Sequence, residues 1–142
     1  MGAWQGWISW WRELRRPKSL GERGEDAAAR FLRKLGYKIL ARRAAIGRGD
    51  IDIVALDGQT LVFVEVKTRT SPDAGGPEGA VDATKQRKLT KLALAYIKQH
   101  GLWDYPARFD VVALVWAPGD KRPTITHFPD AFAAADANGF YS

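Results

Sequence analysis

The sequence predicts a mixed α/β fold in which helices flank a sheet. Apolar residues recur at helical spacing over residues 20–36 and again over residues 80–100. Apolar runs bounded by glycine-containing turns, as expected for strands, lie between and after these segments. The order helix, three strands, helix, one or two strands predicts an antiparallel meander followed by a crossover helix.

The first predicted helix, over residues 20–36, carries an acid on its apolar side. The predicted apolar face includes Ala28, Leu32 and Leu35, and Gly36 suits a C-terminal cap. Glu25 precedes these three residues by three, seven and ten positions. Glu25 is therefore expected to point toward the core and not toward water.

The remaining elements follow from turns and apolar patterns. A loop over residues 71–79 holds three glycines and two prolines. The second helix, over residues 80–100, is expected to bury Leu89, Leu92, Ala93 and Tyr96. Strands are predicted over residues 37–45, 50–56, 61–69, 108–116 and 124–128.

Composition limits the chemistry that this chain can perform. Its 142 residues are enough for one domain with a core. The absence of cysteine excludes disulfides and thiolate sites, and suits a cytoplasmic location. With only two histidines, a multi-histidine metal site is not expected. A net charge of +6 favours a polyanionic partner, nucleic acid first and anionic membrane second.

The first eighteen residues differ in composition from the rest. Three tryptophans, Ile8 and Leu14 fall at helical spacing before a basic stretch. The simpler interpretation is a short helix packed on its own domain, or a mobile tail; membrane-surface contact through residues 4–18 is the alternative. No apolar run is long enough to span a bilayer, and no signal peptide is recognised. We expect an appendage over residues 1–18, a main domain over 19–130 and a tail over 131–142.

Charged residues interrupt two apolar strands that a tight turn joins. Asp52 lies on the first strand, and Glu65 and Lys67 share one face of the second. Buried carboxylates are costly unless they are paired or bind a metal. Pairing across the Asp57-Gly58 turn would let Asp52 and Glu65 hold one Mg²⁺ or Mn²⁺ ion, with the Val66 carbonyl as a further ligand. Ordinary ion pairs at strand ends are the structural alternative.

Basic residues form two blocks that contain no acid. One runs from residue 27 to 49, and the other begins at the second helix. Lysine and arginine supply most sequence-independent affinity for nucleic acid through phosphate contacts, although a solvated face would explain either block alone. The expected contacts are Arg43, Arg48, Arg69, Lys85, Arg87, Lys88 and Lys91.

Several separated motifs resemble a known family. The Asp…Glu-x-Lys pattern is similar to that of the restriction-endonuclease-like PD-(D/E)-x-K nuclease superfamily. Over residues 20–130 the chain more closely resembles the YraN-like family of small bacterial proteins, whose fold is similar to archaeal Holliday-junction resolvases. The motifs are GERGEDAA (21–28), GDID (49–52), FVEVKTR (63–69), AV (80–81), KQRKL (85–89) and RFDV (108–111).

The resemblance implies roles for individual residues. Asp52 and Glu65 would be metal ligands, Lys67 the catalytic lysine and Glu25 an additional acid acting through water. Gln86, or its neighbour Lys85, would be the polar residue that the second helix directs at the site. Ile51 stands where the superfamily has proline, and Asp50 is shorter than the usual glutamate.

The expected function is divalent-metal-dependent hydrolysis of DNA. Branched and single-stranded DNA are among the candidate substrates. The resemblance leaves a homodimer open, and no small-molecule cofactor is expected. A catalytically inactive nuclease-fold module that binds nucleic acid or a protein partner is the alternative.

Overall fold

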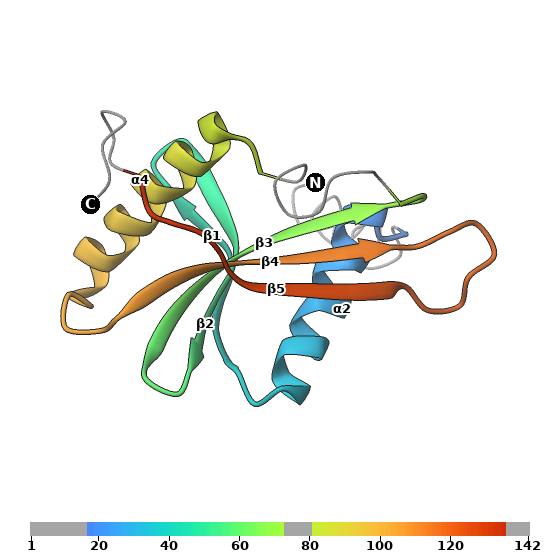
Figure 1. Ribbon diagram of the computed structural model, residues 1–142, viewed down its shortest axis with the longest axis horizontal. Helices are drawn as coiled ribbons and strands as arrows, with labels where there is room; N and C mark the ends of the chain where they lie inside the picture. The colour runs from blue at the N-terminus through green and yellow to red at the C-terminus, as the bar shows by residue number, and fades with distance from the viewer. Residues whose placement is uncertain (1–16, 73–80, 136–142) are drawn as a thin grey trace, which may run out of the picture.

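A five-stranded mixed sheet forms the centre of the computed structural model, which describes residues 17–72 and 81–135 (Figure 1). The strands lie in the order β1-β2-β3-β4-β5, and every neighbouring pair is antiparallel except β3 and β4. The elements are α2 (Leu20–Lys34), β1 (Lys38–Ile46), β2 (Gly49–Asp57), β3 (Thr60–Arg69), α4 (Ala83–His100), β4 (Ala107–Val115) and β5 (Thr124–Phe132).

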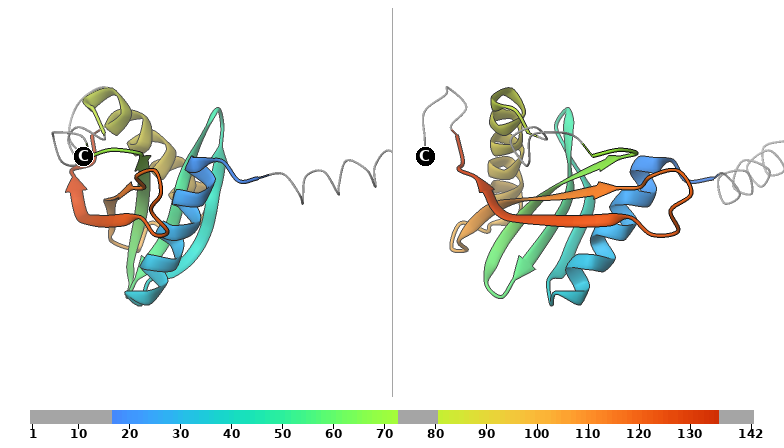
Figure 2. Two further views of the ribbon diagram at one scale, coloured as in Figure 1. Left: turned by 90° about the vertical axis from the view of Figure 1, so that its right-hand side faces the viewer. Right: turned by 45° about the vertical axis from the view of Figure 1, so that its right-hand side comes forward.

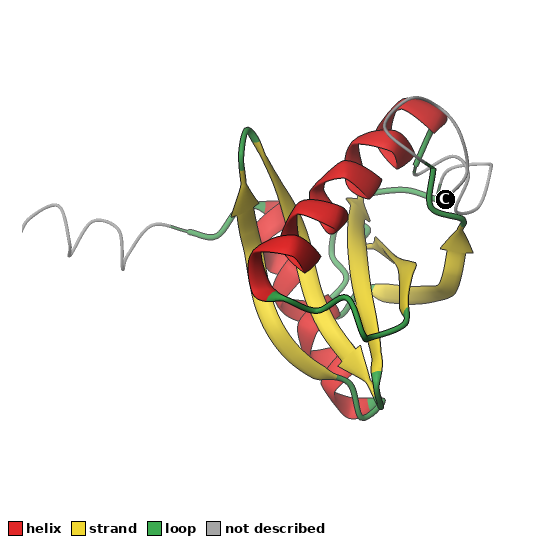
Figure 3. Ribbon diagram, turned by 90° about the vertical axis from the view of Figure 1, so that its left-hand side faces the viewer, coloured by secondary structure: helices red, strands yellow, loops and turns green. Residues whose placement is uncertain are grey.

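The two helices cover opposite faces of the sheet. Helix α4 connects the parallel strands β3 and β4, as a crossover must, and lies in front of the strands in Figure 3 with α2 behind them. The two further views in Figure 2 show the same layers from other sides. This arrangement confirms the predicted α/β class and is consistent with a restriction-endonuclease-like core.

Each helix buries its own apolar layer against the sheet. Leu32 and three alanines of α2 pack on Ile53 and Val64, whereas Leu89, Ala93 and Tyr96 of α4 pack on Phe63 and Val111. The central strand β3 is covered on both sides, which explains its uninterrupted apolar run from residue 61 to 64.

The predicted boundaries are close, with specific corrections. Helix α2 ends at Lys34, and Leu35 is 52% exposed. The prediction that Leu35 lies on the apolar face of this helix is therefore wrong. Helix α4 begins at Ala83, because the Asp82 side chain caps its first turn by accepting from the Lys85 amide. Strand β5 runs on to Phe132, four residues beyond the prediction.

A buried ion network joins β4 to β5. The fully buried Asp110 carboxylate accepts hydrogen bonds from Arg108, His127 and the Asp130 amide. Arg108 also donates to Tyr37, and the His127 ring meets Tyr37 edge to face. Asp110 and His127 thus take part in the packing of β4 against β5.

Some predictions concern residues outside the described part of the chain. Residues 1–16, most of the 71–79 loop and residues 136–142 are among them. Across the described ranges, no helix is both long and apolar enough to cross a membrane.

Candidate functional site

A cavity of about 340 Å³ lies where β2, β3 and the N-terminal ends of both helices meet. Four of the five residues predicted to be catalytic line it together. Among the residues that the structure describes, those lining it are Gly21, Glu25, Asp52, Glu65, Val66, Lys67, Thr68 and Lys85.

The cavity exists because β2 and β3 separate at this point. Their antiparallel pairing runs from the turn as far as Ile53 with Val64 and then stops. Beyond it, β2 pairs only with β1, and β3 only with β4. The Asp52 carboxylate accepts a hydrogen bond of 2.8 Å from the Val66 amide. This side chain therefore links β2 to β3 just beyond the last backbone pair of the two strands. Asp52 and Glu65 are the first residues past the last pair.

An unusual backbone conformation in β1 accompanies this separation. Arg43 has a φ of 49°, in the left-handed region that non-glycine residues rarely adopt. Ordinary alternation would place consecutive residues on opposite faces. Instead, Arg42 and Arg43 both reach Glu25 of α2.

Glu25 is buried, as predicted, and it is held in place by charge. Arg43 Nε donates to its Oε2 at 3.0 Å, and Arg42 Nε donates to its Oε1 at 3.3 Å. Helix α2 approaches β3 very closely beside it: a Cβ added to Gly24 would lie 1.8 Å from Thr68 Oγ1. Glycine at position 24 therefore allows the neighbouring Glu25 to face the cavity.

Lys85 is the residue that α4 directs into the site. Its ammonium group forms an ion pair with Glu65 Oε1. Gln86, the other candidate, instead donates its side-chain amide to the Val81 carbonyl at 3.0 Å and does not line the cavity. Of the two alternatives, the structure brings only Lys85 to the site.

The electrostatics of the cavity leave Asp52 short of positive charge. Burial, followed by repulsion from the Glu65 carboxylate, raises the pKa of Asp52 to about 7. The Val66 amide and Lys85 oppose this shift without cancelling it. A cation beside Asp52 would remove the imbalance.

The donor set fits a hard divalent cation. Carboxylate oxygens on Asp52 and Glu65 are the ligands that Mg²⁺ and Mn²⁺ prefer, and Mg²⁺ commonly takes only one or two carboxylates, with water and phosphate completing its coordination. Within the described residues, no group of three or more acidic or histidine side chains is placed to hold a metal. Glu25, held by its arginines, would thus act through water.

Several predicted DNA-contacting residues lie on α4 or beside it. Gly49, at the start of β2, approaches the side chains of Leu92 and Lys88 on α4. This contact brings the exposed Arg48 to the same part of α4. Lys88 and Lys91 are exposed as well, Arg87 is partly buried and donates to Thr84, and Arg69 ends β3. Arg43, by contrast, is already paired with Glu25.

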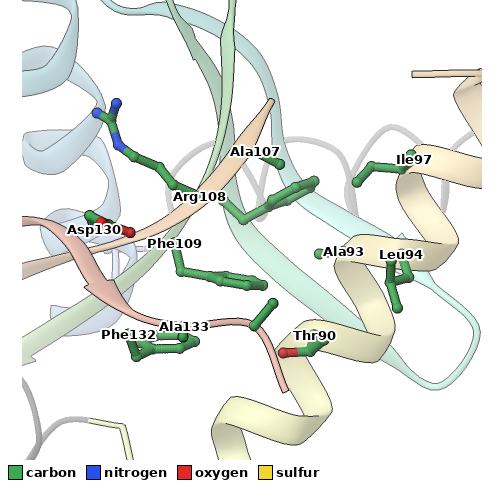
Figure 4. Close-up of a pocket in the computed structure, with 12 residues that line it drawn as sticks. Thr90, Ala93, Leu94, Ile97, Ala107, Arg108, Phe109, Asp130, Phe132 and Ala133 are labelled. Atoms are coloured by element: carbon green, nitrogen blue, oxygen red, sulfur yellow. The ribbon is translucent and has the colours of Figure 1, made fainter. Parts of the chain in front are cut away.

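A second cavity, of about 380 Å³, has a different character (Figure 4). It lies between α4, β4 and the end of β5, and Phe109 stacks on Phe132 in its wall. Its basic residue Arg108 is bound to Asp110. None of the predicted catalytic residues lines this cavity.

Sequence reasoning missed three participants in the site. Arg42, which binds Glu25, was counted only within a basic block, and Thr68 and Gly21 were not assigned a role. Gly24, a glycine in the first turns of the predicted helix, is the signal that could have indicated a close helix–sheet contact.

Comparison with known proteins identifies the family. The model of the family described as "Uncharacterised protein family UPF0102" matches residues 24–114. UPF0102 protein GSU0650 of Geobacter sulfurreducens is 48% identical over 83% of this chain and 91% of its own length. UPF0102 protein RB9115 of Rhodopirellula baltica is 39% identical over 94% of this chain and 84% of its own length. UPF0102 protein STH1475 of Symbiobacterium thermophilum is 48% identical over 82% of this chain and 98% of its own length. The chain therefore belongs to the UPF0102 family, the YraN-like family that its motifs resemble.

Proposed function

We propose that this protein is a Mg²⁺- or Mn²⁺-dependent nuclease that hydrolyses phosphodiester bonds in DNA, with branched and single-stranded forms among its candidate substrates. Placement in the restriction-endonuclease-like superfamily, with similarity to archaeal Holliday-junction resolvases, is part of this proposal. So are a cytoplasmic location and the option of a homodimer.

One observation carries the proposal. Two strands part so that Asp52 and Glu65 face one cavity, with Lys67 beside them. A sheet loses hydrogen bonds by opening in this way, and the buried acids are not matched by apolar packing. Chemistry that requires two carboxylates and an amine at one place explains both features.

Each side chain would have a distinct task. Asp52 and Glu65 would hold the ion, which when bound supplies a more acidic water and neutralises charge on the phosphate. Lys67 would orient or deprotonate the attacking water, or stabilise the phosphate. Glu25, fixed by Arg42 and Arg43, would accept a hydrogen bond from a water in the cavity.

Cleavage assays on a panel of DNAs test the proposal directly. Duplex, single-stranded and four-way-junction substrates would be incubated with Mg²⁺ or Mn²⁺ and with wild type, Asp52→Ala or Lys67→Ala. We expect cleavage by wild type, and a cleavage rate lower by about 100-fold or more in both variants, because each variant lacks a group that stabilises the transition state.

Asp50→Ala is the matched control for these variants. Asp50 lies on the same strand but is exposed and does not line the cavity. This variant should cleave as wild type does. Metal-independent product, or equal product from wild type and Asp52→Ala, would show that a contaminant and not this site cleaves the DNA.

A second candidate function is a nuclease-fold module that binds nucleic acid or a protein partner without hydrolysis. The ion pairs of Glu65 with Lys85 and of Glu25 with Arg43 favour it, because they satisfy two of the acids without a metal. This candidate predicts salt-sensitive DNA binding and no saturable Mn²⁺ binding. It also predicts that Asp52→Ala binds DNA as wild type does.

A further inference from the structure

The Lys85–Glu65 ion pair engages one oxygen of a carboxylate that the proposed metal would also use. Glu65 is nearly buried, with 8% of its side chain exposed, whereas Lys85 is 43% exposed. One partner is thus fixed in a strand and the other is a flexible side chain at the mouth of the cavity. An ion that binds Glu65 through Oε1 would displace the ammonium group from that oxygen and would weaken its attraction to the carboxylate.

We propose that Lys85 is an exchangeable counter-ion: it neutralises Glu65 in the metal-free protein and, when a divalent cation displaces it, becomes a ligand for a DNA phosphate. This inference rests on the proposed function and extends it to the regulation of the same site. It couples metal binding to substrate binding through one side chain.

The position of Lys85 on its helix suits this exchange. Asp82 caps the helix through the Lys85 backbone amide, so the backbone is held while the four-carbon side chain stays free to turn. The N-terminal end of α4 also carries partial positive charge, which favours an anionic phosphate near it. Lys88 and Lys91 follow at helical spacing and would continue the phosphate contacts.

The exchange makes a prediction that a purely structural ion pair does not. Without metal, Glu65 holds Lys85, so Lys85 adds little to DNA affinity. With metal, Lys85 is released and contributes. The effect of removing Lys85 on DNA binding should therefore depend on the divalent ion, and reciprocally DNA should favour metal binding.

The first experiment measures Mn²⁺ affinity without DNA by electron paramagnetic resonance of the free ion. Wild type, Lys85→Met and Lys88→Met would be titrated at pH 8, because Lys85 also lowers the pKa of Asp52 and its removal would otherwise let protons compete. We expect Lys85→Met to bind Mn²⁺ about three- to fivefold more tightly, the effect of losing a competing, partly exposed ion pair. Lys88→Met, one turn along and outside the cavity, should match wild type.

The second experiment measures binding of a fluorescent duplex by anisotropy, with and without Ca²⁺. Lys85→Met should match wild type without Ca²⁺ and bind about fivefold more weakly with it, whereas Lys88→Met should weaken binding equally in both conditions. Lys85→Arg should retain most of the Ca²⁺-dependent affinity. Thermal melts check that all variants fold.

The outcomes separate this inference from the nuclease proposal. Unchanged or weaker Mn²⁺ binding by Lys85→Met, or a loss of DNA affinity that is independent of Ca²⁺, overturns the exchange while leaving metal-dependent cleavage intact. Absence of saturable Mn²⁺ binding in both wild type and Lys85→Met overturns the metal site itself, and the exchange with it.

Discussion

The Asp52 carboxylate bonds the Val66 amide at 2.8 Å, immediately beyond the last backbone pair between β2 and β3. A side chain thus spans the beginning of a gap in the sheet. Burial raises the pKa of the same carboxylate to about 7. Asp52 therefore both bonds the neighbouring strand and has a raised pKa, and substitutions of this one residue can test both properties.

The first prediction concerns stability and pH without divalent ions. Burial raises the pKa of Asp52 from 3.8 to about 7 in the folded protein, so the folded state holds this proton more tightly than the unfolded state. The stabilisation from this proton is fully present below pH 3.8 and is lost as the pH rises toward 7, because the carboxyl group ionises first in the unfolded state. The loss is complete above pH 7, where the folded state ionises too. Asp52→Asn cannot ionise and should become more stable than wild type by up to about 4 kcal/mol at pH 8.

Urea denaturation of both proteins in EDTA at pH 4.5 and pH 8 measures this difference. The two free energies of unfolding should lie close together at the lower pH. Parallel pH profiles for wild type and Asp52→Asn would show that ionisation of Asp52 does not oppose folding.

The second prediction is that divalent ions restore this stability. At an ion concentration 100 times its Kd, a site that exists only in the folded state adds about 2.7 kcal/mol. For a chain of this size, the Tm of wild type should rise by roughly 5–10 °C with Mn²⁺ at pH 8. The rise should be smaller at pH 5.5, where protons occupy Asp52.

Differential scanning calorimetry of wild type, Asp52→Asn and Glu65→Gln gives this measurement, with Asp50→Asn as the control. The two site variants should lose most of the shift, and the control should keep it. An equal shift in Asp52→Asn would place the ion elsewhere.

The third prediction concerns the close approach of α2 to β3. Gly24→Ala would place a Cβ 1.8 Å from Thr68 Oγ1, so either the helix or the strand must move. We expect a destabilisation of about 1–3 kcal/mol, typical of overpacking. Thr68→Gly in the same chain should recover part of the loss.

Gly21→Ala provides the comparison for that variant. It lies one turn earlier on α2, where an added Cβ would lie 4.0 Å from Ser19 Oγ. Since alanine favours a helix by about 1 kcal/mol over glycine, this variant should be neutral or stabilising. A similar loss in both variants in urea denaturation would indicate that glycine itself, and not the contact with Thr68, matters.

The fourth prediction concerns the ion network between β4 and β5. Asp110→Ala would leave Arg108 and His127 without their shared buried partner and should destabilise the fold by about 3–5 kcal/mol. Asp57→Ala removes a partner of Arg108 that is 45% exposed and should have an effect below about 1 kcal/mol. Chemical denaturation distinguishes these outcomes, and equal effects would mean that burial does not strengthen the network.

The sequence predicts where these charged residues lie because the relevant signals are periodic. Helical phasing indicated that Glu25 faces inward, and the turn at Asp57-Gly58 indicated that Asp52 and Glu65 lie together. Both inferences use only the geometry of regular elements. The same geometry supplied the α/β class, since the order of elements follows from periodicity.

The parts that could not be predicted are departures from that regularity. Arginine rarely has positive φ, so nothing in the sequence indicated that Arg42 and Arg43 would both turn toward Glu25. The end of pairing beyond Ile53 depends on tertiary contacts of two neighbouring strands and not on local sequence. Lys85 and Gln86 lie about 100° apart around α4, and which of them faces the cavity depends on how the helix is rotated about its axis, which spacing alone does not fix.

The gap between β2 and β3 also bears on how this protein can change over time. Apolar, β-branched residues at positions 52 and 65 would remove two carboxylates that are costly to hold away from water, and the resulting protein should be the more stable one. Selection for stability alone would therefore remove the two acids. A lineage that keeps Asp52 and Glu65 has a less stable fold than it could have, but it keeps the site. The trade-off between stability and activity should therefore be most direct at these two positions.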